Sequence, residues 1–306
     1  MTTESSRSGR RRLRWVIAAA VTAPFFVYAA LVMRLVLHEY RMNQPPMRGR
    51  LAVSTADASV EGMRDVRIQV DKRFDLGAWY VPPKQGVAVI LTHGTGADRS
   101  STLAEIRLFA AAGVGVLAFD WPGHGTSGGK NRWGRDERAA LAATVTWLTL
   151  QPGVDRRQIG VVGLSIGGYV AAEVAPTDQR IRRLALIGTP TDADYQTIRQ
   201  YLHYGRPAAE FVIKANQWLG LEPDTMKARD LVSRIAPRPL LIITGARDNA
   251  VPTEMSDTLF ALAREPKQFI RLPHSAHLNY LSADSAEYAQ ALISFFTTGR
   301  ALAPPK

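Results

Sequence analysis

The chain has 306 residues, 46% of them hydrophobic, which is enough to bury one large core and to carry an appendage. It contains no cysteine, which excludes disulfides, thiolate metal sites and a cysteine nucleophile. Much of its net charge of +11 comes from the first fifty residues, where nine arginines stand against two glutamates. No basic run is interleaved with aromatic residues, so we expect no nucleic-acid partner.

The first predicted element is an apolar helix. Trp15 to Met33 is an uncharged run of 19 residues, which as a helix spans about 28 Å, close to the hydrocarbon thickness of a bilayer. Arginines crowd its N-terminal side, and its first residue is a tryptophan, a residue favoured at membrane interfaces. We expect a basic tail over 1–14, a transmembrane helix over 15–37 and a linker over 38–50.

The basic tail favours a cytoplasmic N-terminus, which places the rest of the chain outside the cytoplasm. Two alternatives stay open. A cleaved signal peptide has the same basic start and apolar run, with a small-residue site around Val27-Tyr28-Ala29, and would leave a secreted protein. The reverse orientation is the other, because four arginines between residues 34 and 50 make the charge asymmetry modest.

Beyond the linker, predicted strands and helices alternate. Two short alternating runs suit an antiparallel pair at a sheet edge, and later continuous apolar runs suit buried parallel strands. The expected strands are 66–70, 77–81, 87–92, 114–119, 159–164, 184–187, 239–244 and 268–272. The expected helices are 102–112, 135–149, one that opens at Ser165, 253–263 and 283–296. The pattern predicts an α/β domain over 51–300, with helices on both faces of a parallel sheet.

The alternation is interrupted over residues 189–237. This stretch carries amphipathic segments with aromatic residues such as Tyr195, Phe211 and Trp218. Long connections in compact domains are usually lids or binding segments. We therefore expect a small helical cap here, with an ordinary pair of core helices as the alternative.

A serine stands at a sharp predicted turn. In Gly163-Leu164-Ser165-Ile166-Gly167 an apolar strand runs into a helix, and this G-x-S-x-G pattern presents the serine hydroxyl at the carboxyl end of the strand. Small residues are needed on both flanks because the backbone is crowded. Ser165 is the candidate nucleophile, although the same pattern can mark only a tight turn.

A serine nucleophile needs a base to take its proton and an acid to orient that base. Asp248 follows the strand predicted over 239–244, and His277 follows the strand after it. The carboxyl ends of parallel strands meet at one edge of a sheet, where ligands bind. The chain order Ser165, Asp248, His277 therefore predicts a catalytic triad.

Other residues compete for these roles. His274 is the alternative base, but it directly follows a strand and is held nearer the sheet edge than the histidine three residues later. Asp192 or Asp194, beyond the preceding strand, is the alternative acid. Asp120 and His124 belong to a glycine-rich turn; we interpret Asp120 as shaping that turn and His124 as structural or pocket-lining.

Acyl transfer also needs N–H donors for the oxyanion that develops. The N–H of Ile166, at the start of the helix after the serine, is one candidate. The loop His93-Gly94-Thr95-Gly96 directly follows a strand, and its glycines let the backbone turn inward. We expect the Thr95 N–H to be the second donor, with a plain glycine turn as the alternative.

Over residues 65–300 these motifs resemble the α/β-hydrolase superfamily. They are the HG loop (His93-Gly94), the D-x-x-G-x-G-x-S turn (Asp120 to Ser127), the nucleophile elbow and the G-x-x-D-x-x-V-P acid loop (Gly245 to Pro252). The resemblance implies the α/β-hydrolase fold, an eight-stranded, mostly parallel sheet, and a triad on the three residues named above. With its N-terminal apolar segment, the chain is also similar to membrane-anchored serine hydrolases of the Bem46-like and related lipid-esterase groups.

A serine at the elbow argues against haloalkane dehalogenases and epoxide hydrolases, which place an aspartate there. We therefore expect hydrolysis of a small-molecule or lipid-like carboxylic ester, or a thioester, through an acyl-enzyme on Ser165. A peptidase or an acyltransferase with the same triad is the alternative, and a catalytically inactive, membrane-tethered binding protein is a more remote one. No H-E-x-x-H pattern occurs, and no phosphate or dinucleotide fingerprint opens the first strand-helix unit, so we expect neither metal nor cofactor.

Overall fold

The computed structural model describes residues 3–43, 51, 53–132, 134–219 and 227–301. In these residues eight strands form one sheet in the order β1-β2-β4-β3-β5-β6-β7-β8, in which β1 pairs with β2 and β2 with β4 antiparallel while the other pairs are parallel. The strands are β1 Arg64–Val70, β2 Phe74–Val81, β3 Ala88–Thr92, β4 Gly115–Phe119, β5 Ile159–Leu164, β6 Arg183–Ile187, β7 Leu240–Gly245 and β8 Lys267–Leu272. This confirms the predicted eight-stranded, mostly parallel sheet.

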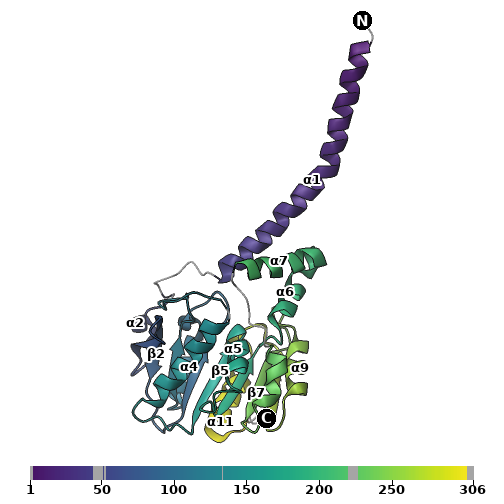
Figure 1. The fold of residues 1–306 in the computed structure, drawn as a ribbon. Coiled ribbons are helices and arrows are strands. Elements are labelled where there is room, and N and C mark those ends of the chain that lie inside the picture. The colour runs from purple at the N-terminus through teal and green to yellow at the C-terminus, as the bar shows by residue number, and fades with distance from the viewer. Residues whose placement is uncertain (1–2, 44–50, 52, 133, 220–226, 302–306) are drawn as a thin grey trace.

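Helices cover both faces of the sheet (Figure 1). One apolar cluster joins the sheet to α4 (Arg135–Thr149), α5 (Ile166–Val174) and α9 (Thr253–Leu262). The other joins it to α3 (Leu103–Ala111) and α11 (Ser285–Thr298). Successive strand residues point to opposite faces, so Ile90 belongs to the first cluster and Leu91 to the second. Short helical segments complete the domain: α2 Thr55–Ala58, η1 Arg99–Thr102, α8 Ala228–Leu231, η3 Val232–Arg234 and α10 Tyr280–Ala283.

The segment expected to form a cap is helical and lies between β6 and α8. It contains α6 (Ala193–Tyr201), η2 (Leu202–Tyr204) and α7 (Arg206–Trp218). The cap follows the carboxyl end of β6. It therefore lies on the side of the sheet formed by the carboxyl ends of the parallel strands, where β5 ends at the predicted nucleophile. Figure 1 shows α6 and α7 beyond that edge, beside the end of α1.

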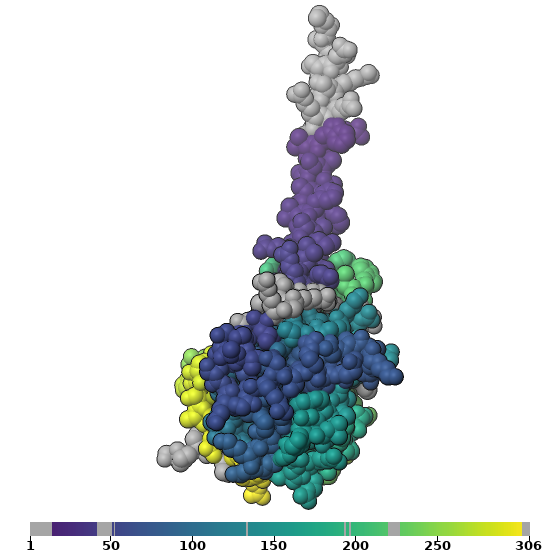
Figure 2. Space-filling view, turned by 90° about the vertical axis from the view of Figure 1, so that its left-hand side faces the viewer, coloured from purple at the N-terminus to yellow at the C-terminus, as the bar shows by residue number. Residues whose placement is uncertain are grey.

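The N-terminal helix α1 runs from Thr3 to Asn43 and projects from the domain as a stalk (Figure 2). It includes 38–43, which were expected to belong to the linker; the remaining linker residues, 44–50, lie outside the described residues. Its segment from Arg14 to Arg41 has a mean hydropathy of 2.2 over its most apolar window, and only 6% of that window is buried. By length and composition this helix can cross a membrane or serve as a signal sequence.

A buried carboxyl group on α3 makes stability depend on pH. Glu105 is buried and accepts a hydrogen bond from the Tyr288 hydroxyl at 3.2 Å. Burial raises its pKa from 4.5 to about 7. The folded state therefore keeps this proton to a higher pH than the unfolded chain does, and the contribution of Glu105 to stability falls as the pH rises from about 4.5 to about 7.

We expect Glu105→Gln to raise the free energy of unfolding at pH 8, by about 3 kcal/mol, because a neutral amide avoids the cost of the buried charge. Near pH 4.5 the substitution should have little effect, since the carboxyl is then protonated in the folded state. Chemical unfolding in detergent, followed by circular dichroism at both pH values, measures the difference. An equal change at the two pH values would contradict the assignment.

Candidate active site

Ser165 lies in a strained turn between β5 and α5. Its backbone angles are φ 55° and ψ −123°, in the positive-φ region that residues other than glycine rarely adopt. Its N–H donates to the Ile187 carbonyl at 2.8 Å, which ties the turn to β6. A Cβ added at Gly163 would lie 2.3 Å from the Gly168 Cα, and one added at Gly168 would lie 2.0 Å from the Thr189 Oγ1. Both glycines are therefore required by close approach.

The His277 ring lies between Ser165 and Asp248. Its Nε2 is 3.1 Å from the Ser165 Oγ, and its Nδ1 is 2.7 Å from the Asp248 Oδ2. The Asp248 side chain is fully buried, and that of His277 is 23% exposed. A carboxylate accepts from Nδ1–H, which leaves Nε2 free to accept the serine proton. The structure thus brings the three residues of the predicted triad into one chain of hydrogen bonds.

Backbone donors fix the orientation of the Asp248 carboxylate. Its Oδ1 accepts from the N–H groups of Ala250 at 2.9 Å and Val251 at 2.8 Å. Its Oδ2 is left for the His277 ring. The two carboxylate oxygens therefore have separate partners, which holds the imidazole in one orientation.

The loops that carry the acid and the base are joined to each other. The Arg247 N–H donates to the Ser275 carbonyl at 2.9 Å, and the Ala246 N–H donates to the Leu272 carbonyl at 2.8 Å. A Cβ added at Gly245 would lie 2.3 Å from the same Ser275 oxygen. These contacts at the ends of β7 and β8 hold the two loops at a fixed separation.

The alternative base and acids lie elsewhere. His274 is exposed, and its backbone N–H donates to the Asp284 carboxylate at 3.1 Å. Asp192 caps α6 with one carboxylate oxygen, which accepts from the N–H of Asp194 at 3.0 Å. Its other oxygen pairs with Lys227 at 2.5 Å. The geometry thus favours Asp248 as the partner of the imidazole, and Asp192 as an anchor at the base of the cap.

The loop after β3 lies directly against the nucleophile. A Cβ added at Gly94 would lie 3.3 Å from the Ser165 Cβ. The buried His93 side chain orients this loop, because its Nε2 accepts from the Trp121 N–H at 3.1 Å and its Nδ1–H then donates to the Gly94 carbonyl at 2.8 Å. Burial lowers the pKa of His93 to about 4, so the ring stays neutral and keeps this pair of bonds.

The two backbone donors expected for an oxyanion have no hydrogen-bond acceptor among the described residues. The peptide between Gly94 and Thr95 is planar and trans, so the Thr95 N–H points away from the Gly94 carbonyl and from His93. Ile166 opens α5, where backbone N–H groups have no partner within the helix. In the described part of the chain, the N–H groups of Thr95 and Ile166 donate to no protein acceptor.

Two contributors to this geometry were missed by sequence reasoning. One is His93. The sequence showed that it lies between a strand and a glycine, but not that its ring forms two hydrogen bonds that orient the loop. The other is Gly188, which has φ 53° directly after β6; a Cβ there would lie 2.7 Å from the Tyr280 hydroxyl and 3.3 Å from the His277 ring. A glycine immediately after a buried strand was the available signal for this close approach.

Asp120 organises the glycine-rich turn, as interpreted from the sequence. Its carboxylate accepts from the N–H groups of Arg99 at 2.7 Å and Thr126 at 2.8 Å, and it forms an ion pair with the Arg99 guanidinium. Gly125 has φ 44°, and a Cβ there would lie 2.2 Å from an Asp120 carboxylate oxygen. The turn is therefore built around a buried carboxylate.

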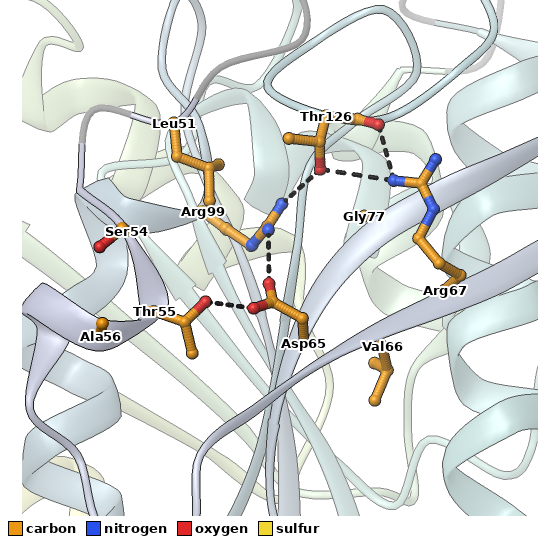
Figure 3. Close-up of a pocket in the computed structure, with 10 residues that line it drawn as sticks. All are labelled: Leu51, Ser54, Thr55, Ala56, Asp65, Val66, Arg67, Gly77, Arg99 and Thr126. Carbon is orange, nitrogen blue, oxygen red and sulfur yellow. Dashed lines mark hydrogen bonds and ion pairs between the residues drawn. The ribbon is translucent and has the colours of Figure 1, made fainter.

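Beside this turn is a groove of about 720 Å³ (Figure 3). Arg99 lies in it between Asp65 and Thr126, and Arg67 contacts the same threonine (Figure 3). Both arginines form ion pairs with carboxylates, Arg67 with Asp75 and Arg99 with Asp65 and Asp120, so their charge is compensated within the protein.

Among the residues that the structure describes, three or more His, Asp or Glu side chains do not gather in a metal-binding cluster.

An eight-stranded sheet with a serine elbow between β5 and α5 defines the class of α/β hydrolases. Residues 89–291 match the model of the alpha/beta hydrolase family, and the chain belongs to this family. Family and fold together support hydrolase activity.

Relatives and solved structures agree with this family. The chain is 27% identical over 297 residues to the protein Rv2307c of Mycobacterium tuberculosis, covering 94% of this chain and 96% of the relative. It is 25% identical over 274 residues to the polyketide transferase grgF of Penicillium sp., covering 74% and 93%. The esterase Pf2001 of Pyrococcus furiosus has the same fold, with a TM-score of 0.70 at 24% identity over 85% of this chain and 99% of that one. The narrower resemblance to Bem46-like proteins stays a prediction.

Proposed function

We propose that this protein is a serine hydrolase that cleaves carboxylic ester or thioester bonds through an acyl-enzyme on Ser165. The observation that carries the proposal is the chain of hydrogen bonds from Ser165 through His277 to the buried Asp248. A nucleophile, a base within its reach and a group that orients the base are the parts that acyl transfer requires.

In this mechanism His277 Nε2 takes the proton as the Ser165 Oγ attacks the carbonyl carbon. The negative charge on the carbonyl oxygen is stabilised by the N–H groups of Thr95 and Ile166. The imidazolium then gives its proton to the departing alcohol or thiol, and an ester links the acyl group to Ser165. Water, deprotonated by the same imidazole, releases the acid and restores the serine.

Labelling by a fluorophosphonate tests the nucleophile. The strained turn exposes the Ser165 hydroxyl to the base, so we expect the probe to form an adduct on Ser165, located by mass spectrometry of the peptides. Ser165→Ala should abolish the adduct. Ser275→Ala is a matched control, because Ser275 is buried in the base loop and hydrogen-bonds Asp284. Undiminished labelling of Ser165→Ala would contradict the proposal.

Acyl transfer to a second alcohol is the other candidate. Two relatives are polyketide transferases, one from Penicillium sp. and one from Stachybotrys chlorohalonatus. The triad geometry serves both reactions, since they differ only in what attacks the acyl-enzyme. The destination of a labelled acyl group, either water or an added alcohol, separates hydrolase from acyltransferase.

We also propose that α1 anchors the protein in a membrane, with its N-terminus in the cytoplasm and the catalytic domain outside. Large apolar side chains along α1 are exposed to more than half of their area: Trp15 67%, Phe25 69% and Phe26 66%. A continuous apolar surface of this kind is unfavourable in water and is stabilised in a bilayer.

Full-length protein should therefore sediment with membranes and resist extraction by high salt, because burial of an apolar helix is insensitive to ionic screening. A variant that begins at Arg50 should be released from membranes and keep near-normal turnover of a water-soluble ester, since every residue proposed for chemistry lies after residue 92. Sedimentation, circular dichroism and kinetics measure these effects. If expression of the full-length gene yields a soluble protein that begins after Ala29, the N-terminal segment is a signal peptide. If the variant that begins at Arg50 folds but is inactive, α1 helps to build the site.

A further inference from the structure

The end of α1 packs against the cap. Val32, Leu35 and Val36 are buried in one apolar cluster with Tyr201 of α6 and Val212 of α7. The remaining members of this cluster on α7 are alanines (Ala208, Ala209 and Ala215), whose small side chains allow the two helices to approach closely. A polar contact closes the interface, because the Tyr201 hydroxyl donates to the Glu39 carboxylate at 2.6 Å.

These contacts begin inside the apolar run of α1. The Tyr28 hydroxyl lies 3.4 Å from the Tyr204 carbonyl of η2. Tyr28 stands five residues before Met33, the end of the uncharged run, which corresponds to about 7.5 Å along a helix. If α1 crosses a bilayer, η2 and the start of α7 therefore lie in the interfacial layer and not in bulk water.

The cap exposes large apolar side chains around this contact. Trp218 is 75% exposed and Phe211 38%, and their rings pack edge to face with centroids 6.0 Å apart. They stand seven residues apart and so share one face of α7. Leu219, which directly follows Trp218, and Leu202 of η2 are also exposed, at 48% and 47%. Tryptophan and tyrosine are enriched at membrane interfaces, and clustered exposed apolar residues mark contact with a membrane or a protein.

We propose that this cap surface, formed by Leu202, Phe211, Trp218 and Leu219, inserts into the interface of the same bilayer that holds α1. Continuity with α1 favours the bilayer over a second copy of the chain. The reason is that η2 already contacts α1 at Tyr28, which lies within the apolar run that ends at Met33. Figure 2 shows the cap, in green, emerging on both sides of the base of the stalk. α1 thus holds the cap against the membrane.

This placement identifies the class of substrate. The cap leaves the sheet after β6, and Ser165 lies at the end of the adjacent strand β5. Gly188, the first residue after β6, is in contact range of the His277 ring. The catalytic edge therefore faces the bilayer, and the substrate is an amphiphilic ester whose acyl chain resides in the membrane. This inference rests on the proposed anchoring and on the proposed hydrolase function.

Fluorescence quenching tests the location of the cap in the full-length protein. The chain has no cysteine, so a thiol-reactive fluorophore added to Trp218→Cys labels position 218 alone. In vesicles of phosphatidylcholine with a nitroxide near the headgroup end of the acyl chain, we expect strong quenching at position 218. Phe26→Cys is the control for insertion of α1. Leu150→Cys is the matched surface control, because Leu150 is 67% exposed and follows α4 at the opposite edge of the sheet.

Quenching at positions 218 and 26, but not at 150, supports the proposal. An unquenched label at 218 beside a quenched label at 26 overturns it, whether the label faces water or a second copy of the chain. Quenching needs no catalytic activity, so it tests the location of the cap independently of the proposed hydrolase function.

Kinetics test the substrate class. Trp218→Ser with Leu219→Ser should lower turnover of a long-chain ester embedded in vesicles by about tenfold or more, because losing the burial of each large apolar side chain costs up to about this factor. Turnover of a water-soluble ester in detergent and fluorophosphonate labelling should not change. Leu150→Ser with Leu262→Ser removes exposed apolar side chains away from the cap and should leave both rates unchanged.

If the cap variant and the unchanged protein turn over the vesicle ester equally fast, the inference that the substrate resides in the bilayer is wrong. A protein that hydrolyses neither ester and binds no fluorophosphonate overturns the hydrolase function instead, and the quenching result then decides the membrane contact alone.

Discussion

Replacing His277 with alanine is expected to lower kcat for a water-soluble ester by roughly 10⁶-fold, the loss found when the base of a serine–histidine pair is removed. The reason is geometric: its Nε2 lies 3.1 Å from the Ser165 Oγ. Without this acceptor the hydroxyl stays protonated and is a weak nucleophile. Steady-state kinetics on p-nitrophenyl esters measure the loss, and circular dichroism verifies that the variant is folded.

His274→Ala is the matched control, because it removes the same side chain three residues earlier in the same loop. The His274 side chain is exposed, and the loop contact of this residue is made by its backbone N–H, which alanine keeps. We therefore expect near-normal kcat for this variant. Near-normal activity of His277→Ala combined with a large loss in His274→Ala would assign the base to the other histidine.

The sheet could be predicted from the sequence because its strands are nearly continuous apolar runs. β5 and β7, for example, are buried along their whole length, and each of the two runs stands out between polar turns. The candidate residues were sought in the loops that follow these strands, because the carboxyl ends of parallel strands meet at one edge of the sheet. Strand-end positions and chain order were therefore enough to propose three residues that the fold places in contact.

The orientation of the candidate site could not be predicted, because it depends on contacts between loops that are distant in the sequence. His93 orients the Gly94 carbonyl only because Trp121, on the loop after β4, donates to its Nε2. The approach of Gly188 to the His277 ring likewise joins two loops that follow different strands. Neither contact leaves a periodic or spacing signal in the chain.

The relation between α1 and the cap was also beyond sequence reasoning. An apolar run of 19 residues predicts a helix that can cross a membrane, but its hydropathy does not show that one end packs on α7. The linker was expected to begin at residue 38, yet Glu39 accepts a hydrogen bond from Tyr201 and α1 continues to Asn43. The tertiary contact extends the helix past the end of its apolar pattern.

Replacing Asp248 with asparagine is expected to lower kcat by roughly 10⁴-fold through a change of tautomer. The N–H groups of Ala250 and Val251 both donate to Oδ1, so the side-chain oxygen of asparagine will occupy that position. Its NH₂ group then faces the His277 ring. Nδ1 must accept from this amide, which moves the ring proton to Nε2, where it faces the Ser165 hydroxyl and blocks proton transfer.

Asp194→Asn is the matched control, since Asp194 is the rival acid and lies on the cap. It should reduce kcat little, because the Asp194 side chain is not part of the hydrogen-bond chain that ends at Ser165. For Asp248→Asn the loss should appear in kcat with KM almost unchanged, since the substrate does not contact the carboxylate. A loss below about tenfold in Asp248→Asn, together with a large loss in Asp194→Asn, would assign the orienting carboxylate to the first turn of α6. The buried Asp248 would then only shape its own turn.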